Sequence, residues 1–267
     1  MRASRTFAIV LRQVYLLRGS PTRLLPMVAW VAIDIVLWGF ITRYLSAFTG
    51  PRIDLVASIL GAVLLWDFLG RVMQGVTTAF FEDVWSRNFL NIFATPLTIA
   101  DYLGGLVLTG VGTSLMGLAV MLTLASSVFG LSFFSYGAAI VPFLLVLFIT
   151  GISLGVLGAA IVLRLGPASE WLIWPIPSLL SPFAGVFYPL STLPGWMQAI
   201  GRALPPSYVF DAMRAIVAGH PAPPQTLAFA VGLSLAYLLA ACWVFAAVYR
   251  YAIRTGLIAR YSAESAN

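Results

Sequence analysis

The chain contains no lysine, one cysteine and one histidine, and only 9% of its 267 residues are charged. The absence of lysine excludes a conventional phosphate-binding P-loop and Schiff-base catalysis, because both need a lysine amine. One cysteine and one histidine cannot form an internal disulfide or a Cys/His zinc cluster, so we expect no metal site. The shortage of charge also separates the chain from soluble domains, in which about 25% of residues are charged.

Hydrophobic residues make up 61% of the chain and form long apolar runs. A helix needs roughly 20 mostly apolar residues to cross a bilayer. The sequence predicts six such spans, at about residues 24–45, 53–79, 102–128, 133–163, 171–189 and 226–249. We therefore expect an all-α, multi-pass membrane protein, with a six-helix domain over residues 24–250. The fifth span is expected to be broken, because it contains Pro175, Pro177 and Pro182.

Arginine is distributed unevenly between the connections. With six spans, ten arginines lie on the side that holds both termini, four lie on the other side, and Arg71 lies within a span. Positive charge marks the cytoplasmic side, so both termini, including a tail over residues 251–267, are expected in the cytoplasm. This rule also explains the net charge of +6, since the arginines are scattered between apolar runs, and no nucleic-acid partner is expected.

Residues 1–23 predict an imperfect amphipathic helix on the membrane surface. Its two expected faces carry Phe7, Val10, Leu11, Val14 and Leu17 on one side, and Arg2, Arg5 and Arg12 on the other. Ile9 and Leu16 interrupt this pattern. A plain basic tail is the alternative interpretation.

Residues 190–219 follow the fifth span and are rich in proline and glycine. They predict two helices that are too short to cross the membrane and therefore lie in, or re-enter, the outer leaflet. The first is expected to begin at Pro194 and to end at Pro205 and Pro206. The second is expected to begin with Ser207 as its N-cap and to end at Gly219.

Charge gathers in the stretch FFEDVWSRNFLNIFATPLT, between the second and third spans. A helical wheel of residues 81–93 separates an apolar face from a polar face. The apolar face holds Phe81, Val84, Trp85, Phe89 and Ile92, and the polar face holds Asp83, Ser86, Arg87 and Asn91. Asp83 and Arg87 are four residues apart and are expected to pair. We expect a cytoplasmic surface helix that docks a partner and ends near Thr95-Pro96; a solvated loop is the alternative.

The run from Ser181 to Arg214 carries a distinctive set of residues. They are Pro182, Tyr188-Pro189, Leu193-Pro194, Trp196, Leu204-Pro205 and the closing Arg214. With six spans and a cytoplasmic helix before Thr95-Pro96, this run resembles the ABC-2 type permease family, the membrane subunits of one class of ABC exporters. The resemblance covers nearly the whole chain. Many members carry Arg-Glu-x-Gly-Thr before a Ser-Pro; this chain has Glu82-Asp83 before Thr95-Pro96 and lacks the Gly-Thr.

The resemblance implies a half-transporter of the bacterial plasma (inner) membrane. It would pair with a second copy or a close relative, and an ABC ATPase subunit would bind ATP and Mg beneath it. The missing lysine agrees, because this chain cannot supply a Walker A motif. Residues 81–93 would be the coupling helix, and its ATPase-coupling residues would be Glu82, Asp83, Trp85, Ser86, Arg87, Leu90 and Asn91. The family exports drugs, lipids or polysaccharide precursors, and the sequence does not choose among them.

Three charged residues lie inside predicted spans. Asp34 lies in the first span, and Asp67 and Arg71 lie one helical turn apart in the second. Charge inside a bilayer is costly unless it is paired or faces water. These residues either pair structurally or line a polar translocation path. They also support an alternative function, an ion- or proton-coupled secondary transporter, although no inverted repeat is visible between the halves. An intramembrane enzyme is disfavoured, because no catalytic cluster is apparent.

Aromatic residues gather near the outer end of the fifth span. Phe183, Phe187 and Tyr188 are candidate residues of an outer gate, or a surface on which a sugar stacks. The alternative is an aromatic belt at the membrane interface.

Overall fold

The structure is a computed structural model that describes residues 3–19, 21–49, 56–85, 91–92, 95–131 and 137–257. Within this part of the chain every regular element is a helix. The elements are α1 (Ala3–Arg18), α2 (Pro21–Thr49), the π-helical turn η1 (Val56–Leu60), α3 (Gly61–Trp85), α5 (Ile99–Phe129), α6 (Ile140–Leu165), the 3-10 helix η3 (Pro167–Leu172), α7 (Ile176–Ala184), the 3-10 turn η4 (Leu190–Thr192), α8 (Gly195–Ala203), α9 (Pro205–Val217) and α10 (Pro224–Arg254). The all-α prediction is confirmed.

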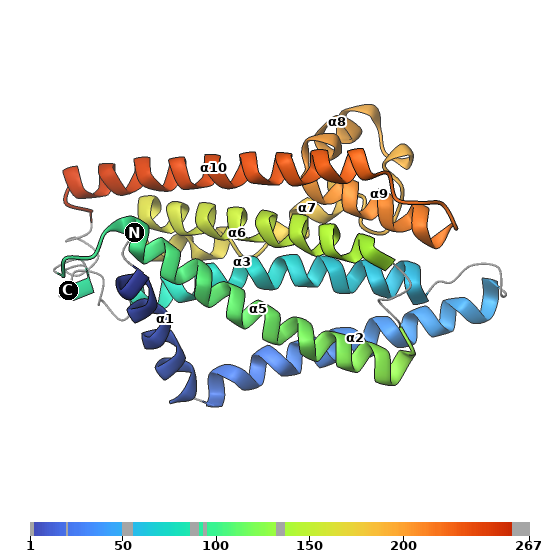
Figure 1. The fold of residues 1–267 in the computed structure, drawn as a ribbon, viewed down its shortest axis with the longest axis horizontal. Coiled ribbons are helices and arrows are strands. Elements are labelled where there is room, and N and C mark those ends of the chain that lie inside the picture. The colour runs from blue at the N-terminus through green and yellow to red at the C-terminus, as the bar shows by residue number, and fades with distance from the viewer. Residues whose placement is uncertain are drawn as a thin grey trace.

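Four helical segments among the described residues are long and apolar enough to cross a membrane. They are Ser58–Trp85, Ile99–Phe129, Gly137–Leu165 and Pro224–Arg254. They coincide with the second, third, fourth and sixth predicted spans, and they indicate a membrane protein. The first predicted span lies within α2, a helix of 29 residues. In Figure 1 the long helices run side by side along the bundle, and the start of α1 lies at the same end as the last turn of α10.

The centre of the bundle is α3, which packs against α5 on one side and α6 on the other, with α10 covering α6. Glycines allow the close approach of α6 to α3. A Cβ atom on Gly151 would lie 2.8 Å from the carbonyl oxygen of Leu69, and one on Gly155 would lie 2.9 Å from that of Met73. Small residues at this spacing are typical of helix pairs that associate within membranes, where packing replaces the hydrophobic effect.

The fifth predicted span is interrupted, as expected. The chain forms η3, turns at residues 173–175, and then forms the nine-residue helix α7. Gly185 ends α7 with φ of +62°, a conformation that favours glycine.

The short helices α8 and α9 lie at the end of the bundle opposite the start of α1 (Figure 1). α8 begins directly after Pro194, as predicted. The predicted boundary of α9 is wrong: Pro205 and Pro206 begin this helix, and Ser207 lies inside it. Proline is favoured in a first helical turn because its missing N–H has no intrahelical partner there. The chain turns at Gly219 after α9, as predicted, with φ of +82°.

The helix α1 forms where the amphipathic helix was expected, but a different face meets the protein. Thr6, Ile9 and Gln13 are buried, whereas Phe7 is 63% exposed. Ile9, which interrupted the sequence pattern, lies so close to Gly105 of α5 that a Cβ atom there would be 2.5 Å from it. The expected apolar face is therefore left available to lipid, while the opposite side of α1 packs on the bundle.

Candidate functional site

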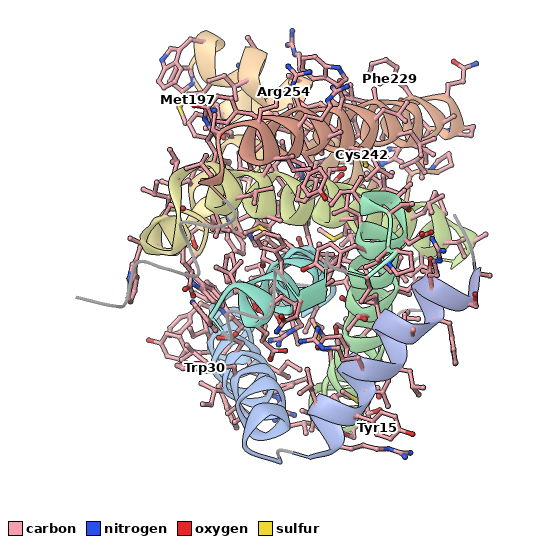
Figure 2. The ribbon with its side chains drawn as sticks, turned by 90° about the vertical axis from the view of Figure 1, so that its left-hand side faces the viewer. Tyr15, Trp30, Met197, Phe229, Cys242 and Arg254 are labelled. Carbon is pink, nitrogen blue, oxygen red and sulfur yellow. The ribbon has the colours of Figure 1, made fainter. Side chains whose placement is uncertain are left out.

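A cavity of about 600 Å³ lies between α1, α2, α3, α5 and the segment after η3. Its lining residues are Gln13, Trp30, Asp34, Asp67, Arg71, Gln74, Gly75, Thr78, Ala79, Glu82, Thr109, Thr113 and Trp174. Figure 2 views the bundle from the end at which α1 lies and shows nitrogen and oxygen atoms gathered between these helices. Tyr15, on the same helix as Gln13, points away from them (Figure 2). Polar and charged side chains thus line part of an open cavity in an otherwise apolar bundle.

The helix α3 supplies most of the polar lining. Asp67, Arg71, Gln74, Thr78 and Glu82 follow one another at spacings of three or four residues, so they form one stripe along the helix. The other face of α3 carries fully buried core residues such as Phe68 and Val72. The structure therefore gives this central helix an apolar side that packs against its neighbours and a polar side that faces the cavity.

The charged residues predicted inside the membrane meet in this cavity. Arg71 donates from Nε to Asp67 Oδ2 at 2.8 Å, and its Nη2 lies 2.7 Å from the same oxygen. Asp34 lines the same cavity from α2. The two interpretations of these residues are compatible, because Asp67 and Arg71 pair with each other and all three residues line the cavity.

Two lining side chains were not expected from the sequence. Gln13 on α1 is 3% exposed and lines the cavity, and no described residue accepts a hydrogen bond from its Nε2. Trp174 lines the cavity from the segment after η3, and its Nε1 donates to Glu170 Oε1 at 3.0 Å. The indole N–H of Trp174 therefore has an acceptor, whereas the buried Nε2 of Gln13 has none among the described groups.

Beside the cavity, a charged cluster ties three helices together at the α1 end of the bundle. Arg12 Nη1 on α1 lies 2.5 Å from Asp83 Oδ1 on α3. Tyr102 on α5 donates from its hydroxyl to Asp83 Oδ2 at 2.8 Å. The Asp83 side chain is fully buried and that of Arg12 is 28% exposed. A buried carboxylate of this kind needs a cation and hydrogen-bond donors to offset its desolvation, and both are present.

This cluster corrects the predicted polar face of residues 81–93. Asp83 does not face outward, because Arg12 and Tyr102 hold it inside the bundle. Residues 81–85 are also not the start of a separate helix, since α3 continues through them to Trp85. The neutralised carboxylate explains this continuation, because the helix can pass a buried charge that already has its partners. Of the predicted apolar face, Phe81, Val84 and Ile92 are buried, Trp85 is 53% exposed, and Phe89 lies outside the described residues.

The other coupling residues fall into two groups. Glu82 is half-buried and lines the cavity, Trp85 is 53% exposed, and Asn91 is exposed. Ser86, Arg87 and Leu90 lie outside the described residues. Thr95 and Pro96 form a bend before α5, which begins with Thr98 as N-cap and Asp101 completing a capping box.

The three aromatic residues predicted at an outer gate make separate contacts. Phe183 packs edge-on against Trp196 of α8, with ring centroids 6.2 Å apart. Phe187 stacks on Trp38 of α2 at 5.5 Å, and the Tyr188 hydroxyl donates to the carbonyl of Pro182 at 2.9 Å. These contacts join α7 to α8 and the segment after α7 to α2, and among the described residues the three rings do not form one aromatic cluster.

Sequence reasoning missed Gln13, Trp30, Thr109, Thr113 and Trp174 as lining residues, and Arg12 and Tyr102 as partners of Asp83. The spacing of some of these residues in the sequence could have identified them. Trp30 and Asp34 on α2, and Thr109 and Thr113 on α5, are each four residues apart, as on the α3 stripe. A search for polar stripes along the predicted spans would have found these pairs.

No protein-family model matches the chain, and no curated protein matches it. Its function therefore has to be inferred from its own residues and their geometry.

Proposed function

We propose that the chain is the membrane permease subunit of an ATP-driven ABC exporter in the bacterial plasma membrane. In this proposal six membrane-crossing segments, with both termini in the cytoplasm, form the translocation path together with a second copy or a close relative. A separate ABC ATPase subunit binds ATP and Mg and supplies the energy. The chain itself acts as a path and not as an enzyme.

The observation that carries this proposal is the cavity in an apolar bundle whose lining includes a stripe of polar and charged side chains. Polar and charged side chains are costly within a membrane and mark substrate or ion pathways when they face a common space. Here they line about 600 Å³. Cavities of about 300–1,000 Å³ are typical of sites for small molecules.

A second observation supports coupling to a partner. The polar stripe on α3 ends at Glu82, within the segment that resembles a coupling helix. Asp83, the next residue, is tied to α1 and α5 through Arg12 and Tyr102. A partner that moves this end of α3 would therefore move a wall of the cavity and two neighbouring helices together.

An ion- or proton-coupled secondary transporter is the second candidate, and the cavity residues Asp34, Asp67 and Arg71 favour it. Transporters of that class often have broken helices at matching positions of two halves. In the described first half, α2, α3 and α5 are helices of 29, 25 and 31 residues, and the short turn η1 leads directly into α3, whereas the short helices α7, α8 and α9 lie in the second half. This asymmetry favours the exporter.

Purification of the tagged chain together with the ATPases of its host tests the two candidates. The exporter proposal expects a stoichiometric ATPase with a Walker A motif to copurify, and expects its ATP hydrolysis to change when the permease is present. Purification of an active chain alone, with transport driven by a proton gradient and indifferent to ATP, would favour the secondary transporter instead.

Trp85 offers a direct test of the coupling segment, because it is 53% exposed at the end of α3. Exposed tryptophans at interfaces commonly contribute 2 kcal/mol or more to binding, so we expect Trp85→Ala to weaken ATPase binding about 30-fold. Trp243→Ala is the matched control, since Trp243 is 69% exposed on α10. Binding is measured by titrating the ATPase onto the permease in nanodiscs. Equal affinity for both variants would contradict the assignment.

A further inference from the structure

The side chains that line the cavity differ in charge and in hydrogen-bond partners. These differences indicate which class of ligand the cavity binds. Asp34, Asp67 and Arg71 line the same cavity, so two carboxylates accompany one guanidinium there. The direct ion pair of Arg71 is with Asp67 on the same helix. When all three groups are ionised, the cluster carries one net negative charge in a low-dielectric surrounding. A cation in the cavity would balance that charge.

Aromatic faces lie beside this negative charge. Trp30 is one helical turn before Asp34 on α2, and Trp174 lines the cavity from the segment after η3. Glu170 accepts the hydrogen bond of the Trp174 indole, which fixes the ring and leaves its π-face for contact. Tryptophan is the side chain that attracts organic cations most strongly through its ring. The two indoles therefore favour a cation that also has an apolar or aromatic body.

The amide of Gln13 points to a third property of the ligand. Gln13 is 3% exposed and lines the cavity, and its Nε2 has no acceptor among the described residues. A buried donor without an acceptor costs about 1–3 kcal/mol relative to a satisfied one. A ligand that carries a carbonyl or ether oxygen would accept this hydrogen bond.

We propose that the cavity binds an amphipathic organic cation with an aromatic body and a hydrogen-bond acceptor. The positive charge lies against Asp34 and Asp67, the aromatic part contacts Trp30 and Trp174, and the acceptor takes the hydrogen of Gln13. This inference rests on the proposed function, since it names the class of cargo for the same cavity. It is narrower than that function, because an exporter of neutral lipids or of anions would have the same fold.

The test compares two probes of the same shape and opposite charge. Purified permease in nanodiscs, without any ATPase, is titrated with tetraphenylphosphonium and with tetraphenylborate, and empty nanodiscs correct for partition into lipid. We expect saturable binding of the cation, quenching of tryptophan fluorescence, and no saturable binding of the anion. Equal binding of both probes, or saturable binding of neither, would overturn the proposal.

Substitutions of lining residues test whether the cation binds in the cavity. Removal of one charge within contact distance is expected to weaken cation binding about tenfold, so Asp34→Asn should do this while Asp34→Glu, which keeps the charge, should bind as the parent does. Asp211→Asn, on α9 outside the cavity, is the matched control. Unchanged affinity in Asp34→Asn would contradict the assignment.

The contribution of the tryptophan is tested by a pair of neighbours. Trp174→Leu should weaken binding and reduce the quenching, whereas Trp171→Leu should do neither, because Trp171 is 82% exposed and does not line the cavity. Equal effects of the two substitutions would count against the site.

The hydrogen bond is tested with a second cation. Carbamoylmethyl-triphenylphosphonium has the charge of tetraphenylphosphonium and also carries a carbonyl acceptor. We expect it to bind the parent chain several-fold more tightly than tetraphenylphosphonium does, and to lose this advantage in Gln13→Met. If the carbamoylmethyl cation still binds Gln13→Met more tightly than tetraphenylphosphonium does, Gln13 does not donate a hydrogen bond to the ligand.

These binding experiments fail independently of the proposed function. A permease that copurifies with its ATPase but binds no cation refutes the cargo and leaves the exporter. A permease that binds the cation in the cavity but has no ATPase partner refutes the exporter and leaves the site.

Discussion

Polar side chains have different partners in two regions of the bundle. Between the long helices, charged groups interact with other side chains, as Arg12 does with Asp83 and Arg71 with Asp67. The second region is the short-helix unit, defined as residues 176–217, where Arg214 also pairs with Asp211 but side-chain donors mostly reach backbone carbonyls. There Arg214 donates to the carbonyl of Gly185 at 2.7 Å, and Tyr188 and Tyr208 donate to the carbonyls of Pro182 and Arg202.

The difference follows from helix length. Every helix leaves its last four carbonyl groups without an intrahelical partner, so a chain segment made of short helices exposes many of them. The short-helix unit satisfies several of these acceptors with side-chain donors, and the Tyr237 hydroxyl of α10 adds one to the carbonyl of Ala203 at 2.9 Å. In the long helices most carbonyls are satisfied within the helix, and the hydroxyls of residues such as Thr109 donate to carbonyls of their own helix. The charged side chains between these helices pair with one another instead. Three substitutions test this contrast.

The largest effect on stability is expected at the α1 end. Asp83→Ala removes the carboxylate that Arg12 and Tyr102 share, and leaves a partly buried cation. Breaking a buried ion pair by removing one partner costs about 3 kcal/mol. We expect a loss of this order in equilibrium unfolding in mixed micelles. The triple variant Arg12→Met, Asp83→Leu, Tyr102→Phe removes every partner at once and should recover most of it. A triple variant as unstable as Asp83→Ala would show that the polar contacts are not the cause.

A smaller effect is expected for the arginine of the short-helix unit. Arg214→Met removes a charge-assisted hydrogen bond to the carbonyl of Gly185 and the ion pair with Asp211. A hydrogen bond to a charged group contributes about 2 kcal/mol. Arg202→Met is the control, since Arg202 is exposed and its hydrogen bond is to the side chain of Gln198. In the same measurement, the free energy of unfolding should fall for Arg214→Met and stay unchanged for Arg202→Met. Losses of equal size would show that the hydrogen bond from Arg214 to the backbone has no special role in stability.

The smallest effect is expected for a neutral donor. Tyr237→Phe removes the hydrogen bond from α10 to the carbonyl of Ala203 and should cost about 1 kcal/mol. Tyr15→Phe should cost nothing measurable, because Tyr15 is 63% exposed. If Tyr237→Phe lowered the free energy of unfolding as much as Arg214→Met does, the charge of Arg214 would contribute little to the stability of the short-helix unit.

The long helices were predictable because length and apolar composition decide them. Residues 102–128 and 226–249 were expected as spans, and the structure has α5 and α10 there. The interruption of the fifth span was also predictable from its prolines. The boundaries of α9 were not, because proline both ends and begins helices, and only the packed chain shows which role Pro205 takes.

The candidate site was predictable in part. Asp34, Asp67 and Arg71 stood out because charge is rare in this chain, and the structure places them in one cavity. The direction of Asp83 was not predictable from residues 81–93 alone. Its partners, Arg12 on α1 and Tyr102 on α5, lie outside that stretch, and a helical wheel of residues 81–93 contains no information about them.

The ion pair between Arg12 of α1 and the buried Asp83 of α3 has a consequence for how the protein is assembled. α1 is synthesised before Asp83 and Tyr102, so Arg12 has neither partner when α1 first meets the membrane. Until α3 and α5 are inserted, we expect the guanidinium to stay among the lipid headgroups and water. We therefore expect α1 to dock late in the assembly of the bundle. A chain truncated after α2 is expected to leave α1 accessible to protease, whereas the full chain protects it.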